Sequence, residues 1–168
     1  SSPTNSSTIS RTATATFGFR ALGTDGTSRV WFAGSSLNNG DGNGREPCRL
    51  EDPTTYPRFI NPMPTSGHDH ADFQAVADNG ICAGQYQYGG TAPNGGSRNA
   101  LKWDGGPSCL ALNTLMGSPS SSYEAVAKAI SRDSMVVGGS SHYPGGGGLF
   151  QPVIWKNTTT PTAIPFLP

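Results

Sequence analysis

The same short pattern occurs more than once in this chain, and the repetition restricts the fold more than any other feature. Residues 73–87 read FQAVADNGICAGQYQ, and residues 123–142 read YEAVAKAISRDSMVVGGSSH. When residues 130–138 are aligned over 76–84, both copies show an apolar stretch, a polar turn, a second apolar stretch and a glycine. The Asn-Gly pair at 79–80 is a strong hairpin signal, because both residue types tolerate a positive φ. Each copy therefore predicts a β-hairpin.

Further matches extend each hairpin into a larger unit. Residues 100–103 and 152–155 both end in tryptophan, and a short closing segment follows each of them, at 110–117 and 162–168. A weaker first copy has a turn at 25–26, the segment RVWFAGSS at 29–36, Leu50 in the tryptophan position and a closing segment at 58–64. The chain thus divides into three repeats of about 50 residues, a period typical of solenoids, propellers and arrays. Their approximate bounds are 15–64, 72–117 and 122–168.

A unit of this size cannot bury its own apolar face, so the copies must stack to share a core. We therefore predict an all-β fold of three four-stranded, antiparallel, blade-like repeats in a propeller-like arrangement, forming one domain over residues 15–168. An N-terminal arm, residues 1–14, precedes the domain. The segment EAVAKAI at 124–130 has the composition of a helix, but its alignment on a hairpin predicts a strand. The alternative fold is an immunoglobulin-like β-sandwich completed by a donated N-terminal strand.

The cysteines distinguish these two folds. In a four-stranded meander, Cys82 lies on the second strand and Cys109 just before the fourth, two ladder spacings or roughly 9–10 Å apart. That separation exceeds the ~7 Å Cα limit for a disulfide. Blade-like repeats therefore predict no Cys82–Cys109 bond, whereas a sandwich accommodates a cross-sheet bridge. Neither these two nor Cys48 forms a C-x-x-C pair, so no zinc site is predicted.

The second and third copies resemble a known family. The segments AISRDSMVVGGSS, QPVIWKN and AIPFLP are similar to the HAF-type repeats of bacterial extracellular proteins, whose pattern is roughly A-[IV]-N-x-x-G-x-[VI]-x-G, a loop, A-F-x-W and a D-L-G-T-L-like end. The similarity is greatest over residues 72–168. Leu101 and Val153 replace the phenylalanine of the pattern, and its end is reduced to LNTLMG and IPFLP. The resemblance implies a blade-like β-meander in a secreted or surface protein, and it implies no enzyme activity.

The N-terminal arm continues into an alternating segment, TISRTATATFGFRA at 8–21, which predicts a β-strand about twice the ordinary length of 5–6 residues. One face of its first half carries Ile9, Arg11, Ala13 and Ala15, and we take these as the assembly strand. A half-apolar strand must pair, because an open edge favours aggregation. It could complete a sheet of its own chain or be donated to the open edge of a neighbouring subunit.

Composition excludes several classes of partner. Only 13% of residues are charged and the formal net charge is zero, so we expect no nucleic-acid partner, which requires a basic surface. No apolar run approaches the ~20 residues of a membrane span. Ser, Thr and Asn are abundant, and Asn5 and Asn157 lie in N-x-[ST] acceptor triplets, which makes them candidates for glycosylation in a secreted protein.

The sequence contains two candidate metal sites and no catalytic signature. Calcium could bind the oxygen donors of Asn39, Asp41, Asn43 and Glu46, which alternate as in the start of a calcium loop, although the bidentate Glu is replaced by Leu50. The competing interpretation is an ordinary turn. His68 and His70, with Asp72 or His142, could hold zinc or copper, against the alternative of a solvated linker. No G-x-S-x-G elbow occurs, and we expect no cofactor other than calcium.

We therefore expect a non-enzymatic structural subunit, secreted or on the cell surface. It would self-associate through N-terminal strand addition into a fibre or pilus-like filament that carries glycans. The alternative is a monomeric extracellular module that binds glycans or proteins.

Overall fold

The computed structural model describes residues 16–27, 29–37, 45–51, 58–59, 70–88, 97–120, 122–142 and 149–165. Within this part of the chain every regular element is a strand, and no helix is found that could cross a membrane. The strands form three antiparallel sheets of four strands each, so the all-β prediction is confirmed.

Each sheet is an up-and-down meander made from consecutive strands. The first contains β1 (Thr16–Thr24), β2 (Val30–Leu37), β3 (Arg45–Glu51) and β4 (Arg58–Phe59). The second contains β5 (Ala71–Val76), β6 (Cys82–Tyr88), β7 (Ser97–Trp103) and β8 (Leu110–Ala111). The third contains β9 (Ala125–Ile130), β10 (Val136–His142), β11 (Phe150–Lys156) and β12 (Thr162–Ala163).

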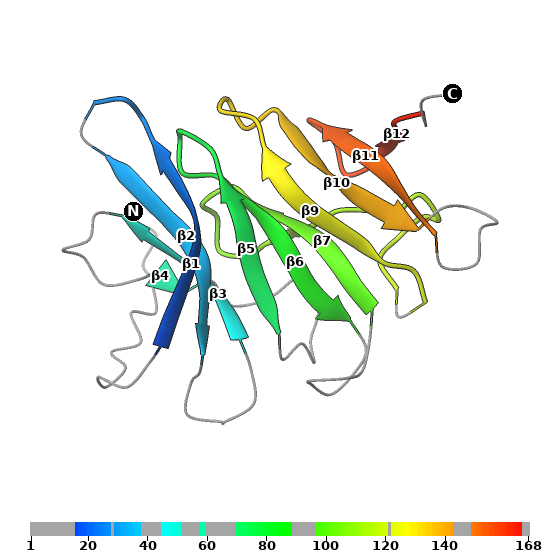
Figure 1. The fold of residues 1–168 in the computed structure, drawn as a ribbon, viewed down its shortest axis with the longest axis horizontal. Coiled ribbons are helices and arrows are strands. Elements are labelled where there is room, and N and C mark those ends of the chain that lie inside the picture. Colours follow the sequence, from blue (N-terminus) through cyan, green and yellow to red (C-terminus); the bar gives the residue numbers. More distant parts are fainter. Residues whose placement is uncertain are drawn as a thin grey trace, which may run out of the picture.

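The three sheets follow one another across the molecule in chain order (Figure 1). β5 begins at Ala71, one residue before the approximate bound of the second repeat. Residues 125–130 form β9 rather than a helix, as the alignment predicted. The two-sheet immunoglobulin-like sandwich is wrong, because the described strands form three separate meanders.

The hairpin turns at the start of each sheet have the same local chemistry. Oδ1 of Asp25, Asn79 and Asp133 each accepts a hydrogen bond from the backbone N–H two residues later. The residue after each of these side chains has a positive φ: 78° at Gly26, 80° at Gly80 and 63° at Ser134. A short polar side chain and a left-handed residue close a tight turn in each repeat, as the Asn-Gly pair predicted.

A β-bulge recurs in the first strand of every sheet. Arg20, Gln74 and Lys128 are the unpaired residues, evenly spaced along the chain. Beside each bulge, a glycine of the next strand lies close to backbone atoms of the bulged strand, which leaves no room for a side chain. A Cβ added to Gly34, Gly84 or Gly139 would lie 1.9–2.0 Å from a carbonyl oxygen of the preceding strand.

This glycine position corrects one detail of the sequence alignment. Gly138 was aligned with Gly84, but the structure places Gly139 at the equivalent site. The turn of the third hairpin contains Met135 as an additional residue, which moves the strand that follows by one position.

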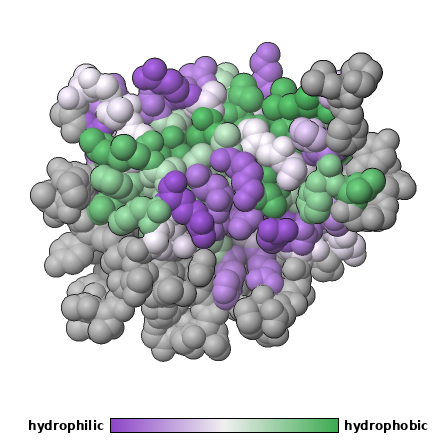
Figure 2. Space-filling view, viewed as in Figure 1, coloured by the Kyte–Doolittle hydropathy of each residue, from purple (hydrophilic) through white to green (hydrophobic). Residues whose placement is uncertain are grey.

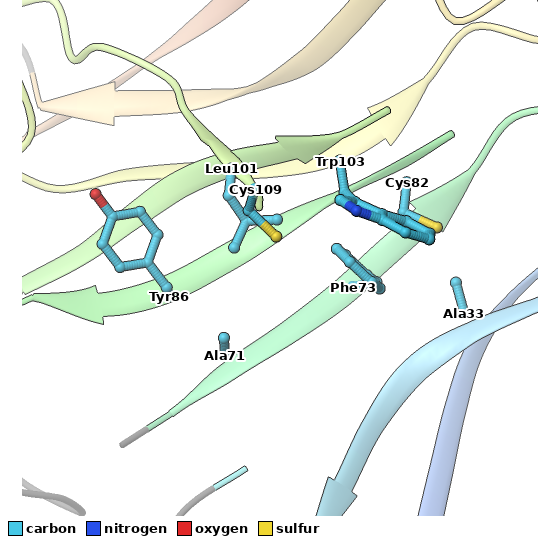
Figure 3. Close-up of a cluster of buried hydrophobic side chains, with 8 residues drawn as sticks. All are labelled: Ala33, Ala71, Phe73, Cys82, Tyr86, Leu101, Trp103 and Cys109. Atoms are coloured by element: carbon cyan, nitrogen blue, oxygen red, sulfur yellow. The ribbon is translucent and has the colours of Figure 1, made fainter. Parts of the chain in front are cut away.

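The core lies between successive sheets. Phe73, Cys82, Leu101 and Trp103 of the second sheet meet Ala33 of β2, and the rings of Phe73 and Trp103 stack with their centroids 6.0 Å apart (Figure 3). Between the second and third sheets, Ala83 and Ala100 meet a second set of buried side chains. Its larger members are Leu112, Val137, Val153 and Trp155. Trp103 and Trp155 are fully buried, so they are core residues.

Candidate functional site

The faces of the sheets are not equivalent, and the difference organises the molecule. We call the face with Trp103 and Cys82 in the second sheet the leading face, because it packs on the preceding sheet. The opposite face, which carries Ala83 and Lys102, is the trailing face and packs on the sheet that follows. Trp103 and Trp155 lie on leading faces, and small residues, Ala33, Ala83 and Ala100, lie on the trailing faces that they meet.

One cation lies at the centre of the contact between the first two sheets. The guanidinium carbon of Arg49, on β3, lies 4.4 Å from the ring centroid of Trp31 and 4.4 Å from that of Trp103. Nη1 of Arg49 donates a hydrogen bond of 2.6 Å to the carbonyl oxygen of Gly80 in the second turn. A planar guanidinium suits this position, since it stacks on aromatic faces and still presents N–H donors at its edge.

The next contact repeats this arrangement with a lysine. In the strand pairing, Lys102 stands opposite Ala83, just as Arg49 stands opposite Ala33. Nζ of Lys102 donates a hydrogen bond of 2.8 Å to the carbonyl oxygen of Ser134. At both internal contacts, a cation on the trailing face donates a hydrogen bond to the turn of the following sheet. Ile154 takes this position in the third sheet, where it pairs with Gly138.

The turns also contact one another directly. Nε of Arg132 lies 2.7 Å from Oδ2 of Asp78, and the N–H of Asp78 donates to the carbonyl oxygen of Arg132. Nδ2 of Asn79 donates to Oγ of Ser134, which explains a serine at a position where glycine is usual. These bonds fix the rotation of the third sheet relative to the second.

Sequence reasoning missed Arg49, Lys102 and Trp31 as contact residues. A usable signal was present, because a cation directly precedes the tryptophan position in two copies, as Arg49-Leu50 and Lys102-Trp103. Only the pairing of strands and the packing of sheets show which face such a cation occupies.

Most of the predicted site residues lie outside the described residues. These are Ile9, Arg11, Ala13 and Ala15 of the assembly strand, Asn5, the calcium candidates Asn39, Asp41 and Asn43, and His68. The fourth calcium candidate, Glu46, lies in β3. The other glycosylation candidate, Asn157, is exposed directly after β11, with φ at 51°.

Among the described residues of the proposed zinc or copper site, the side chains of Asp72 and His142 contact protein groups, and the carbonyl oxygen of His70 accepts from the N–H of Gln87. Nε of Arg20 lies 3.0 Å from Oδ2 of Asp72, and Nε2 of Gln74 donates to the same oxygen at 2.6 Å. His142 lies in the third sheet, where its Nδ1 accepts from the N–H of Glu124 at 3.2 Å. In the part of the chain that the structure describes, no three His, Cys, Asp or Glu side chains gather as a metal site.

The three cysteines are buried free thiols, which confirms that Cys82 and Cys109 form no disulfide. As predicted, Cys82 begins the second strand of its sheet and Cys109 directly precedes the fourth. Burial raises the pKa of Cys109 to about 12, and burial likewise raises the pKa of Cys82, so both remain protonated at neutral pH. Protonated, buried thiols are poor nucleophiles.

We therefore expect the native protein not to react with Ellman's reagent at pH 8, because the reagent requires an accessible thiolate. After unfolding in guanidinium chloride, all three thiols should titrate. A native chain that releases colour within minutes would contradict the buried positions, and an unfolded chain with one titratable thiol would reveal a disulfide.

The surface offers two further groups of residues for binding. Tyr123, His142 and Phe150 form an aromatic cluster, with ring centroids 6.5 Å apart for the first pair and 4.7 Å for the second. Exposed apolar side chains also lie on the outward faces of the first and third sheets. In the view of Figure 2, hydrophobic residues form a band across the molecule, with hydrophilic residues on either side.

Comparison of the chain with models of protein families, with curated proteins and with solved structures finds no match.

Proposed function

We propose that this protein is a non-catalytic structural subunit, secreted or displayed on a cell surface, that joins its neighbours through its N-terminal strand into a fibre. We further propose that its three sheets are blades of a propeller-like arc. The resemblance to HAF-type repeats supports a blade-like, extracellular interpretation. Closed propellers typically contain 4–8 blades, so an arc of three needs further sheets to close.

The position of β1 carries the proposal. This strand is the edge of the first sheet and begins at Thr16, directly after the alternating arm. Its register with β2 ends at the pair Thr16–Leu37. Strand addition to another subunit would give the alternating segment before Thr16 a pairing partner.

A glycan- or protein-binding module is the second candidate. It is favoured by the aromatic cluster, in which Tyr123 is 39% and Phe150 is 37% exposed, because exposed aromatic side chains on a rigid sheet commonly serve as binding anchors. This alternative requires no assembly, so the chain would remain a monomer.

Deletion of residues 1–14 tests the first proposal. We expect the shortened chain to fold with an unchanged melting temperature and to lose fibre formation in negative-stain images. A peptide of residues 5–18 should then bind the shortened chain and block assembly of intact chains. Ala13→Asp should act like the deletion, with Thr12→Asp on the opposite face as the control.

Three results would count against this route. A fall in soluble yield without any change in assembly would indicate that the arm completes its own chain. A chain that is monomeric with or without the arm would favour the binding module. Unchanged assembly and stability in every variant would mean that the arm has no structural role.

A further inference from the structure

The turn of the second hairpin connects all three sheets. From the first sheet, Nη1 of Arg49 donates to the carbonyl oxygen of Gly80 at 2.6 Å. Nε1 of Trp31, also in the first sheet, donates to the carbonyl oxygen of Asp78 at 3.1 Å. Toward the third sheet, the N–H of Asp78 donates to the carbonyl oxygen of Arg132. A covalent change in this turn would therefore act on both internal contacts.

The same turn contains a dipeptide that can lose ammonia in water. Gly80 follows Asn79, and a glycine has no side chain to shield its backbone nitrogen from the preceding side chain. After hydroxide removes the proton of the Gly80 N–H, this nitrogen attacks Cγ of Asn79. The N–Cγ bond forms, the Cγ–Nδ2 bond breaks, and Nδ2 takes a proton from water and leaves as ammonia. Water then hydrolyses the cyclic imide. Opening at Cγ gives aspartate, and opening at the main-chain carbonyl gives isoaspartate, whose main chain is one carbon longer.

The folded turn holds the groups that this reaction must move. The N–H of Gly80 donates to the carbonyl oxygen of Ala77 at 2.9 Å. Oδ1 of Asn79 accepts from the N–H of Ile81 at 3.2 Å, and its Nδ2 donates to Oγ of Ser134 at 3.0 Å. Attack on Cγ requires the first bond to break and the side chain to rotate away from the other two partners. Two of these bonds lie within the turn, whereas the bond to Ser134 exists only while the third sheet is in place.

The two products differ in how they fit the turn. Aspartate already occupies the equivalent position in the first and third repeats, where Oδ1 of Asp25 and of Asp133 accepts the same hydrogen bond from the N–H two residues later. Isoaspartate instead adds a carbon to the main chain directly before Gly80. There is no room for the resulting shift, because even a Cβ on Gly80 would lie 2.9 Å from Nη1 of Arg49 and from the ring of Trp31. The turn therefore accepts aspartate but not isoaspartate.

We propose that Asn79 is a deamidation site that the contact between the second and third sheets protects, and that its isoaspartate product makes separation of these sheets irreversible. While the sheets are in contact, the bond to Ser134 holds Nδ2 away from the path of the reaction. When they separate, the exposed side chain of Asn79 is free to rotate, and ammonia is lost. A chain that has formed isoaspartate then cannot restore the hydrogen bond between Arg49 and Gly80.

Two substitutions separate the protecting contact from the product. Ser134→Gly removes the hydroxyl that accepts from Nδ2 of Asn79. It preserves the backbone of the third turn, because Ser134 has a φ of 63°, which glycine adopts at least as readily. Asn79→Asp is the matched control, since it places aspartate in the second turn without isoaspartate and cannot release ammonia at this position.

Peptide mapping by mass spectrometry measures the rate of deamidation at Asn79 during incubation at pH 8. The folded chain should react at least about tenfold more slowly than the same chain in urea, because the reaction requires the turn to open. Without urea, Ser134→Gly should react roughly fivefold faster than the intact chain, the factor expected for the loss of one neutral hydrogen bond. In urea the two chains should react at the same rate. The Asn-Gly pairs at 39–40, 43–44 and 94–95, which lie outside the described residues, give the rate of an unprotected pair in urea.

Refolding from urea then tests the irreversible step. The isoaspartate form, separated from the aspartate form by chromatography, should not regain the native melting transition, whereas Asn79→Asp should refold with a melting temperature close to that of the intact chain. The inference is overturned if deamidation at Asn79 is as fast without urea as with it, or if Ser134→Gly reacts at the rate of the intact chain when both are folded. It is likewise overturned if the isoaspartate form refolds like Asn79→Asp.

Discussion

Arg49→Ala is expected to lower the free energy of unfolding by roughly 3 kcal/mol. The substitution removes a charged hydrogen bond to the carbonyl oxygen of Gly80, a type of bond worth about 1.5–3 kcal/mol. It also removes the stacking on Trp31 and Trp103, each contact being worth roughly 0.5–1 kcal/mol. The expected loss in free energy of unfolding is less than the sum of these three contributions, because the same side chain makes all three contacts. Urea unfolding followed by tryptophan fluorescence measures the change.

Two comparisons show which part of the Arg49 contact matters. Lys102→Ala removes the equivalent hydrogen bond to Ser134, so it should cost about 1.5 kcal/mol. Arg49→Lys keeps a hydrogen-bond donor but loses the planar group that stacks on the rings. Its loss in free energy of unfolding should therefore lie between the losses caused by Arg49→Ala and Lys102→Ala. If Arg49→Ala costs no more than Lys102→Ala, the two tryptophan rings add nothing to the stability of the first contact.

Gly139→Ala is expected to cost about 3 kcal/mol or more, while Gly138→Ala next to it should change stability by less than about 1 kcal/mol. A Cβ on Gly139 would lie 2.0 Å from the carbonyl oxygen of Val126 and 3.0 Å from the ring of Trp155. The bulge at Lys128 brings that backbone close, so the strand would have to separate from β9 to accept a methyl group. On the other face of the sheet, a Cβ on Gly138 would have only the Cβ of Ala129 near it, at an ordinary contact distance of 3.9 Å.

The midpoint of urea unfolding of the two variants measures this difference directly. Gly84→Ala provides a second test in the middle sheet, since its Cβ would lie 2.0 Å from the carbonyl oxygen of Asp72. A Gly138→Ala variant that is less stable than Gly139→Ala would restore the alignment made from sequence alone. It would show that the third hairpin has the same length as the second.

Strand positions could be predicted from the sequence because their signals are local. Period-two alternation, the Asn-Gly turn at 79–80 and the matched tryptophans act within a few residues, and they gave the correct element type even for the helix-like segment 124–130. The one-residue error at Gly138 arose because a turn can accept Met135 without losing its hydrogen bonds, so residue spacing does not reveal the pairing register.

The candidate site was predictable only in part. The absence of a Cys82–Cys109 disulfide followed from strand spacing. The partners of Arg49 could not be predicted, because Gly80 and Trp103 come from another repeat and reach it only when the sheets stack.

By itself, the sequence determined that this protein has three copies of a four-stranded β unit with hairpins and apolar faces, because turn chemistry and alternation are properties of neighbouring residues. The tertiary structure decided which face of each sheet meets the next one. It also showed that Arg49 and Lys102 connect the sheets. Those outcomes depend on contacts between residues far apart in the chain, which no local pattern encodes.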